Sequence, residues 1–384
     1  MIKHPQRFAT RWLACSARAI ALLIAVQSLC TAHAYGPNGH QLVGAIADER
    51  LADTPTGKRL RGILQGFTLQ KASVIPDEIK GWDKKGVDDP ATFRYSSRPR
   101  VDAELADFWR ANQPTYDMES EAPNHHWFHY TDVPIEGGQR YADGKVGRSR
   151  WDIVQTINYC VRVLQGSEPE DNPRKITKSI AVILLAHLVG DIHQPLHVGA
   201  QYFDEEGRPV NPDTTQPAYD HHGGNTITFQ FTPAAAQRTG QKKVKFHGFW
   251  DNQAVALSLP FIEKGTPKEE RRAVTDEARR KLVAEWIATE PNGWRMPANL
   301  QPTQYAEAWA NEILPLAVEA HARLDFRNVR PQVDSKGRTL AVGVAHEKPM
   351  PDGVPYHEWA AAVTRENLHK AGWRLADLLE KSLK

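Results

Sequence analysis

The sequence predicts a mainly α-helical fold organised as one domain behind a short leader. Six segments carry apolar residues at spacings of three and four, which is typical of helices with one buried face. Strand-like alternation is rare and short. No internal repeat and no Gly/Ser linker divides the chain, so one large domain is the simplest interpretation.

The predicted elements follow from these patterns in order along the chain. We expect helices over residues 41–51, 150–164, 176–189, 268–289, 304–323 and 357–383, several of them preceded by capping Ser or Asp residues. Strands are expected over 226–231, 243–246 and 339–344. The polar connections 84–123, 201–225 and 328–355 contain Pro and Gly and are expected to be surface loops.

The first 34 residues have the three parts of a secretory signal peptide. Basic residues precede a short apolar run, 19–26, which leads into the small-residue site Ala32-His33-Ala34. Cleavage after Ala34 would make Tyr35 the first residue of an exported protein, periplasmic or secreted. An uncleaved membrane anchor is the alternative, and the apolar run is shorter than an ordinary span.

Removal of 34 of the 384 residues leaves 350, enough for a sizeable core and without a second apolar stretch long enough to cross a bilayer. Only Cys160 remains, expected in the core, so no internal disulfide can form. The formal charge of +2 includes four basic and no acidic residues in the leader, so the remainder carries −2. This charge excludes a broadly basic nucleic-acid-binding surface, and any affinity for phosphate must come from a local site, which bound metal could supply.

The segment 184–197, LLAHLVGDIHQPLH, carries the clearest chemical signal. His187 and Asp191 are four apart on a predicted helix, so both project from one face. Pro195 stops the helix and lets His197 return toward the same region. A polar pair that caps a core helix is the alternative interpretation.

A second pair, His247 and Asp251, repeats the spacing of four. Taken alone, this pair is better explained as an ordinary surface pair or as side chains that contact a ligand. Together the two pairs and a further His fit a multi-zinc site, because zinc prefers imidazole nitrogen and carboxylate oxygen and a catalytic ion needs only three protein ligands plus water.

The spacing His-x3-Asp-x5-His, ending in Asp-Ile-His-Gln-Pro-Leu-His, resembles the signature of the three-zinc single-strand nucleases of the S-one and P-one type. Zinc-dependent phospholipase C is a more distant relative of that family. The resemblance implies a single-domain α-helical phospholipase C/nuclease-like fold with a trinuclear zinc site. It extends in order over nearly the whole chain after the leader.

The resemblance also implies where the other ligands lie. Residues 35–40, YGPNGH, are similar to the family's first residues, which bind one zinc through the α-amino and carbonyl groups of the first residue together with the His. Here Tyr35 stands in place of the usual Trp. Each zinc ion is then assigned its own set: Asp77, His129, His187 and Asp191 for the first, Tyr35, His40 and a bridging Asp191 for the second, and His197, His247 and Asp251 for the third.

The same resemblance implies roles next to the metal ions. Lys80 follows Asp77 where the family is expected to have Arg, and it would counter charge on the phosphate. Asp132 would orient the attacking water or accept a base edge, although a contact to a ligating His is an equal alternative. Tyr130 would stack on a base, with core packing as its alternative, and Asn225 ends the Gly223-Gly224-Asn225 element assigned to substrate binding.

The sequence therefore predicts a zinc-dependent hydrolase that cleaves single-stranded DNA or RNA to 5′-phosphorylated products, with 3′-nucleotidase activity. Nucleic acid or nucleotides are the expected substrates, and no protein partner is indicated. One alternative is a zinc-dependent phospholipase C. Another is a non-catalytic periplasmic zinc-binding protein, which would have no need of Asp132 and Lys80 beside an open metal face.

Overall fold

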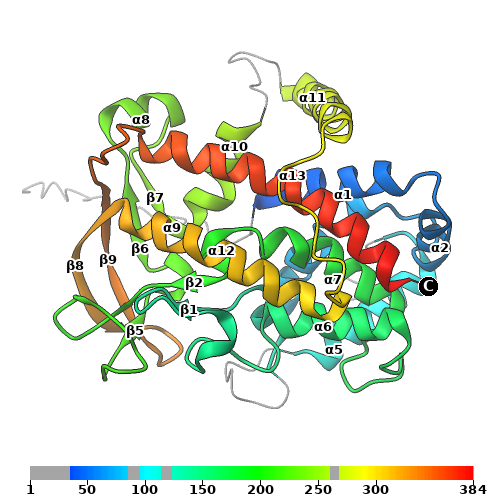
Figure 1. The fold of residues 1–384 in the computed structure, drawn as a ribbon, viewed down its shortest axis with the longest axis horizontal. Helices are drawn as coiled ribbons and strands as arrows, with labels where there is room; N and C mark the ends of the chain where they lie inside the picture. Colours follow the sequence, from blue (N-terminus) through cyan, green and yellow to red (C-terminus); the bar gives the residue numbers. More distant parts are fainter. Residues whose placement is uncertain (1–34, 85–95, 114–122, 260–267, 384) are drawn as a thin grey trace, which may run out of the picture. The chain divides into compact units, whose positions relative to one another are not determined.

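The structure, a computed structural model, describes residues 35–84, 96–113, 123–259 and 268–383 (Figure 1). The leader predicted over residues 1–34 lies outside them. The described residues belong to one compact unit. No helix in the described residues is long and apolar enough to cross a membrane.

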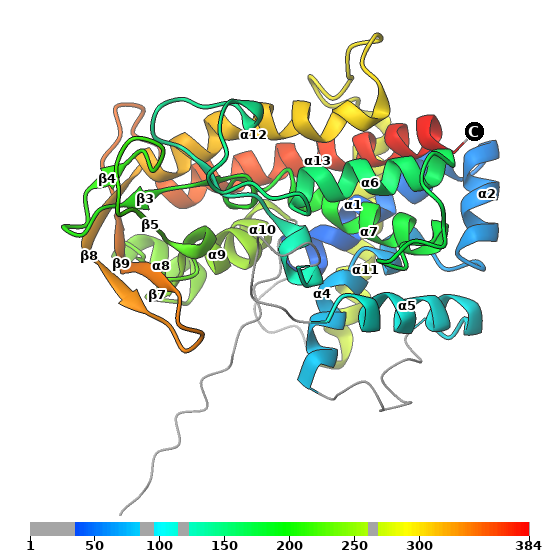
Figure 2. The same ribbon diagram turned by 90° about the horizontal axis from the view of Figure 1, so that it is seen from below.

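Helix α7 (Lys178–Asp191) is the central element. Every residue from Ser179 to Asp191 is buried, as expected for a helix that is apolar on all sides. Thr177 begins it by accepting a hydrogen bond from the Ile180 amide. The helices that surround it in Figures 1 and 2 are α1 (Gly36–Leu51), α3 (Leu69–Ala72), α5 (Pro99–Ala111), α6 (Ile153–Gln165) and α13 (Tyr356–Ser382).

Close packing holds α13 against α1. Gly372 of α13 lets that helix approach α1 closely, because a Cβ atom there would lie 2.6 Å from the Ile46 side chain. Cys160 of α6 is fully buried, which confirms its predicted place in the core. The other helices are α2 (Pro55–Ile63), α4 (Ile75–Glu78), α8 (Pro233–Thr239), α9 (Phe246–Gly248), α10 (Val255–Ser258), α11 (Lys268–Ala288) and α12 (Tyr305–Ala322).

A four-stranded sheet lies at one end of this unit, in the order β7-β6-β9-β8 (Figure 1). Strands β8 (Leu324–Val333) and β9 (Thr339–Glu347) form an antiparallel hairpin, β9 runs parallel to β6 (Ile227–Gln230), and β6 pairs antiparallel with β7 (Lys243–Lys245). Strand β7 leads directly into α9. The sheet therefore places the start of the helical segment that carries His247.

Two-residue strands tie distant segments together near the end of α7. Strand β1 (Val133–Pro134) pairs in parallel with β2 (Gly199–Ala200), and the Thr131 amide donates to the His197 carbonyl at 2.9 Å. These contacts hold the segment 129–132 beside His197. A small antiparallel sheet follows, made of β3 (Tyr202–Phe203), β4 (Pro209–Val210) and β5 (Tyr219–Asp220).

The mainly α-helical class is confirmed, and the six predicted helices are present with shifted ends. The prediction that three connecting regions are surface loops is wrong in part. Helix α5 lies inside 84–123, with Val101, Leu105 and Phe108 buried at helical spacing, and β8 and β9 lie inside 328–355. Strand β8 carries polar side chains such as Arg327, Asn328 and Arg330, but pairing with β9 satisfies its backbone whatever its side chains. The region 201–225 contains β3, β4 and β5.

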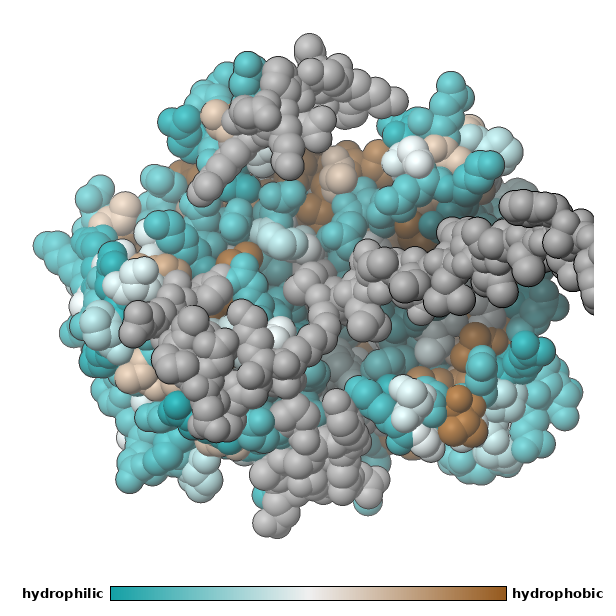
Figure 3. Space-filling model, turned by 180° about the vertical axis from the view of Figure 1, so that it is seen from behind, coloured by the Kyte–Doolittle hydropathy of each residue, from teal (hydrophilic) through white to brown (hydrophobic). Residues whose placement is uncertain are grey.

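The described surface is mostly hydrophilic. On the face in Figure 3, hydrophobic side chains appear in small, separate patches. The exposed large hydrophobic side chains are scattered valines: Val274, Val318, Val333 and Val354. Scattered apolar residues of this kind are ordinary on a folded surface and mark no docking face.

Candidate metal centre

The last turn of α7 carries His187 and Asp191, both fully buried. His187 Nδ1 donates to the Ser73 carbonyl at 2.6 Å, and its Nε2 lies 3.1 Å from Asp191 Oδ2. Burial alone would lower the pKa of His187, but the Asp191 and Asp77 carboxylates raise it above its usual value. A cation, either a proton or a metal ion, is therefore favoured between these side chains.

Helix α1 begins at Gly36, five residues earlier than predicted, and this extension carries His40. His40 Nε2 lies 3.2 Å from Asp191 Oδ1, and the His40 ring stacks on the His187 ring with centroids 3.8 Å apart. Neither ring nitrogen of His40 has a hydrogen-bond partner among the described residues. Gly190 allows this approach, because a Cβ atom there would lie 2.9 Å from His40 Nδ1.

His129 approaches the same carboxylate from the segment 125–129, and Asp77 on α4 approaches His129 and His187. His129 Nδ1 lies 2.9 Å from Asp191 Oδ2, 3.0 Å from His187 Nε2 and 3.8 Å from Asp77 Oδ1. Lys80 Nζ donates to Asp77 Oδ1 at 2.8 Å. Side chains from α1, α4, the segment 125–129 and α7 thus form one cluster around His187 and Asp191.

A second group joins His197, His247 and Asp251. Each His donates its Nδ1–H to a backbone carbonyl at 2.6 Å, His197 to that of His129 and His247 to that of Gly223. Both lone pairs are therefore on Nε2, and these two nitrogens face each other at 3.2 Å. Two facing lone pairs repel each other unless a cation lies between them. A hydrogen bond from the other ring nitrogen, here Nδ1, to a backbone carbonyl is typical of a His that binds metal.

Asp251 lies in a π-helical turn, Phe249–Ala254, a form that occurs often at functional sites. Its Oδ2 lies 3.3 Å from His247 Nε2 and has no hydrogen-bond partner among the described residues. Its Oδ1 accepts a hydrogen bond from Gln194 Nε2 at 3.0 Å. The sequence analysis did not assign Gln194, although an amide within the ligand-bearing segment 187–197 is the kind of signal that could have found it.

Three buried carboxylates, Asp77, Asp191 and Asp251, concentrate negative charge in this cluster. Burial, and then the Asp77 and Asp191 charges, raise the pKa of Asp251 well above its usual range. Burial also acts to raise the pKa of Asp191, but His187 and His197 hold it well below that range. Buried charges of one sign need compensation, which cations would supply.

The donor set fits divalent metal ions. Within each of three buried groups the ligand atoms lie within 4.8 Å of one another, and imidazole with carboxylate is a donor set that zinc prefers. Burial, and then His197, lower the pKa of His247 to about 3, which keeps it in the neutral form that binds metal. The groups are His40–His187–Asp191, Asp77–His129–His187 and His197–His247–Asp251.

Tyr35 lies fully buried at the start of α1. Burial raises the pKa of its phenol, and the Asp251 and Asp191 charges raise it further, so the side chain is close to both carboxylates. The next residue, Gly36, packs against the Asp251 carbonyl, where a Cβ atom would lie 2.9 Å from the oxygen. The first turn of α1 is thus beside the metal groups, and backbone coordination by Tyr35 stays a prediction.

Behind Tyr35 lies a buried hydrogen-bond network. The Tyr35 hydroxyl and Asn367 Nδ2 both donate to the His193 carbonyl. The His193 ring donates to the Val189 carbonyl at 2.7 Å and accepts from the buried Arg374 at 2.9 Å. His193 is therefore a buried part of the wall behind the first turn of α1.

Asp132 lies beside other carboxylates rather than in any of the three metal groups. Burial, and then Asp220 and Asp152, raise its pKa well above the usual range. Its Oδ1 has no hydrogen-bond partner among the described residues. The half-buried Tyr130 lies next to this position, with its ring 5.7 Å from that of Trp127. The sequence analysis did not assign Asp220.

Asn225 makes a local contact, since its Nδ2 donates to the His222 carbonyl at 2.9 Å. The two glycines before it explain the Gly-Gly-Asn element physically. Gly223 has φ +57° and Gly224 φ +86°, and a Cβ atom on Gly224 would lie 2.9 Å from the Phe246 ring. This turn presents a carbonyl to His247, and substrate binding by Asn225 stays a prediction.

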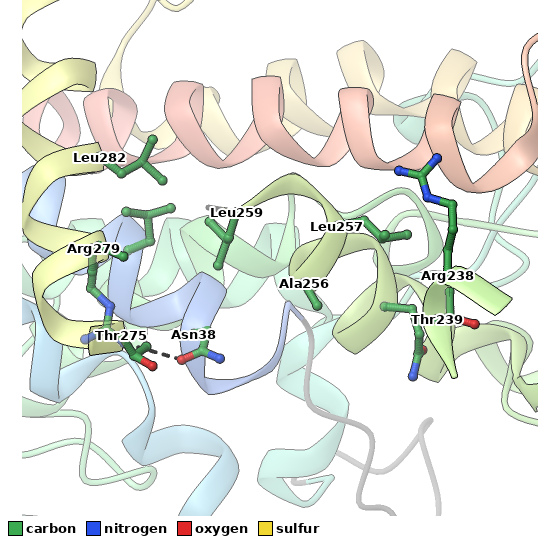
Figure 4. Close-up of a pocket in the computed structure, with 12 residues that line it drawn as sticks. Asn38, Arg238, Thr239, Ala256, Leu257, Leu259, Thr275, Arg279 and Leu282 are labelled. Carbon is green, nitrogen blue, oxygen red and sulfur yellow. Dashed lines mark hydrogen bonds between the residues drawn. The ribbon is translucent and has the colours of Figure 1, made fainter. Parts of the chain in front are cut away.

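A cavity of about 320 Å³ lies beside the first turn of α1 (Figure 4). Its wall is mainly apolar, with Leu42, Leu257 and Leu282 among the lining residues, and Arg279 donates to Asn38 Oδ1 at 3.3 Å. No predicted metal ligand lines it. The cavity is therefore distinct from the metal centre.

Comparisons with known proteins agree with this geometry. A family model described as S1/P1 Nuclease matches residues 35–384. Endonuclease 4 of Arabidopsis thaliana is 26% identical over 270 residues, covering 67% of this chain and 72% of that protein. Endonuclease 2 of the same plant is 20% identical over 266 residues, 66% of each chain. The chain belongs to the S1/P1 nuclease family, metal-dependent hydrolases that cleave phosphodiester bonds in nucleic acid.

Proposed function

We propose that the protein is a zinc-dependent endonuclease that cleaves single-stranded DNA and RNA to 5′-phosphorylated products and also dephosphorylates 3′-nucleotides. The observation that carries this proposal is the convergence of His40, His129 and His187 on the single buried carboxylate of Asp191. Family membership and the two relatives named as endonucleases support nucleic acid as the substrate.

Three zinc ions would complete the centre, and the Asp191 carboxylate would serve as a ligand in two of the three sets. When bound, zinc lowers the pKa of a coordinated water, so that hydroxide is available near neutral pH as the nucleophile. The ligands would be Asp77, His129, His187 and Asp191 for the first ion, Tyr35, His40 and Asp191 for the second, and His197, His247 and Asp251 for the third.

Two side chains would act on the substrate beside the metal ions. The Lys80 ammonium group, 13% exposed, would counter the negative charge that develops on the phosphate oxygens. The half-buried ring of Tyr130 would stack on a base, which favours single strands because their bases are free to leave the helical stack. The unpartnered Oδ1 of Asp132 would bind the edge of that base.

Export and removal of the leader belong to the same proposal. The Tyr35 α-amino group can act as a ligand only after the chain is cut behind Ala34. The family match begins at residue 35, which supports this cleavage point. The protein would then act in the periplasm or outside the cell.

The test measures hydrolysis of single-stranded DNA, duplex DNA, RNA, 3′-nucleotides and phosphatidylcholine by the chain that begins at Tyr35, with and without a chelator. Cleavage of single strands that stops with chelator and returns with zinc is the expected result. The Asp191→Asn variant, purified identically, controls for contaminating nuclease. Hydrolysis of phosphatidylcholine alone would overturn the proposal in favour of a phospholipase C, and chelator-resistant cleavage would overturn the zinc chemistry.

A further inference from the structure

A pair of buried imidazoles lies outside the metal groups. His221, which follows β5, and His321, on α12, have exposed fractions of 0% and 3%. Their rings are nearly parallel, with an interplanar angle of 12°, and their Nε2 atoms are 2.7 Å apart. His321 also packs against the Phe246 ring, with centroids 5.4 Å apart. The pair is thus held firmly within the protein core.

The partners of each ring determine where its proton lies. His321 Nδ1 donates to the Ala317 carbonyl at 2.7 Å, which leaves a lone pair on His321 Nε2. The Gly224 amide donates both to His221 Nδ1 and to the His221 carbonyl, each at 3.0 Å. Because Nδ1 accepts, the His221 proton is on Nε2 and is donated to His321. The Gln201 amide also points at His221 Nε2, but at 3.4 Å this contact is longer and weaker than the 2.7 Å contact to His321. Burial lowers the pKa of His321 to about 4, consistent with a neutral pair at neutral pH.

The turn that His221 holds is in direct contact with a predicted metal ligand. The carbonyl of Gly223 accepts the Nδ1–H of His247 at 2.6 Å. A Cβ atom on Gly223 would lie 3.4 Å from the same ring, and one on Gly224 would lie 3.1 Å from the His247 amide nitrogen. A continuous chain of hydrogen bonds and covalent bonds therefore runs from Ala317 through His321 and His221 to His247.

We propose that His221 and His321 are positioning residues for the third metal group. They hold the Gly223–Gly224 turn in place, and this turn sets the tautomer and direction of the His247 ring, so that Nε2 faces His197 and Asp251. The inference rests on the proposed zinc function. Groups that orient a metal-ligating His in this way alter metal affinity roughly 10- to 100-fold when they are removed.

Two substitutions at one position separate hydrogen bonding from packing. His321→Gln keeps an acceptor near the place of Nε2 but loses the ring, whereas His321→Phe keeps a ring against Phe246 but loses the acceptor. A second pair of substitutions makes the same comparison at His221. His221→Asn keeps a side-chain acceptor for the Gly224 amide, whereas His221→Leu removes it. His369→Phe is the control, since His369 also stacks on an aromatic ring and donates to the Trp286 carbonyl, yet contacts no predicted ligand.

The experiment titrates each metal-free protein, in the form that begins at Tyr35, with zinc against a chelating indicator, and records the absorption spectrum of the cobalt-substituted form. We expect His321→Phe and His221→Leu to lower the affinity for one zinc ion by roughly 10- to 100-fold and to alter the spectrum of the cobalt-substituted protein. His321→Gln, His221→Asn and His369→Phe should stay within about threefold of wild type. The other ions should bind as in wild type.

Two results would overturn the inference alone: wild-type zinc affinity in both His321→Phe and His221→Leu, or weaker binding in His321→Gln than in His321→Phe. The second result would show that ring packing matters and the hydrogen bond does not. A wild-type protein that binds no zinc would overturn the proposed zinc function and this inference with it. If His321→Phe does not fold, comparison of His221→Leu with His221→Asn decides the question.

Discussion

Substitution of Gly190 by alanine sets two physical effects against each other. Gly190 is inside α7, where alanine in place of glycine favours the helix by about 1 kcal/mol. However, the added Cβ would lie 2.9 Å from His40 Nδ1 and 3.2 Å from its Cε1. Ordinary contact begins near 3.4 Å, so the His40 ring must retreat by about 0.5 Å. Metal–ligand distances tolerate only about 0.2 Å.

We therefore expect Gly190→Ala to lower the zinc affinity of the site that includes His40 by roughly 10- to 100-fold, because the His40 ring is displaced rather than removed. Elemental analysis after dialysis and zinc titration of the metal-free protein measure this loss. Gly62→Ala is the matched control, because Gly62 lies in α2 and a Cβ atom there meets nothing within 4 Å. It should raise the free energy of unfolding by about 1 kcal/mol without a change in zinc content.

The outcome that would refute this reasoning is a Gly190→Ala protein that keeps all its zinc and gains stability like Gly62→Ala. The His40 ring would then move without loss of coordination, or would not be a ligand. Measurement on metal-free protein separates the helix effect from metal binding, because bound zinc itself raises the unfolding temperature.

Four further outcomes are expected. Asp191→Asn should release more than one zinc ion and lower kcat/KM by at least about 10³-fold, and full zinc content by elemental analysis would contradict the bridge. Lys80→Ala should lower kcat about 10²- to 10³-fold with normal zinc content, and an unchanged kcat in steady-state assays would exclude its role at the phosphate. One residue added before Tyr35 should abolish single-strand cleavage, and full activity would remove the α-amino ligand. Burial lowers the pKa of His321 to about 4 in the folded protein. Between pH 6.5 and 4 the His321 imidazole is therefore protonated in the unfolded chain but not in the folded one. As pH falls through this range, the metal-free wild type should lose stability relative to His321→Gln, by up to about 1.4 kcal/mol per pH unit. Urea unfolding at several pH values measures this difference, which a constant gap would contradict.

The sequence by itself determined what depends on positions close together in the chain. Helical spacing predicted α7 and placed His187 and Asp191 on one face, because residues four apart on a helix are always neighbours. Family resemblance then named the remaining ligand positions, and the structure brings His40, Asp77 and His129 to the end of α7. Spacing alone carries no information about which helices meet, so these contacts could only be named by resemblance.

Tertiary structure alone decided the contacts between distant segments. The Nε2 atoms of His197 and His247 face each other because β1–β2 pairing and the Gly223 carbonyl orient two rings 50 residues apart. Asp132 lies beside Asp220 for the same kind of reason, although its spacing from His129 suggested a role in orienting the attacking water, in binding a base edge or in contacting a ligating His.

Secondary structure was misjudged where pairing or packing outweighs local composition. Strand β8 exists because β9 satisfies its backbone, and α5 because a few apolar residues on one face are buried beside α7. The imidazole pair His221–His321 has no local signal at all, since its partners are 100 residues apart. The periodicity of a sequence predicts only the neighbours that a residue has along its own helix or strand. The direction of a buried polar side chain depends instead on the hydrogen-bond partner that tertiary packing places next to it.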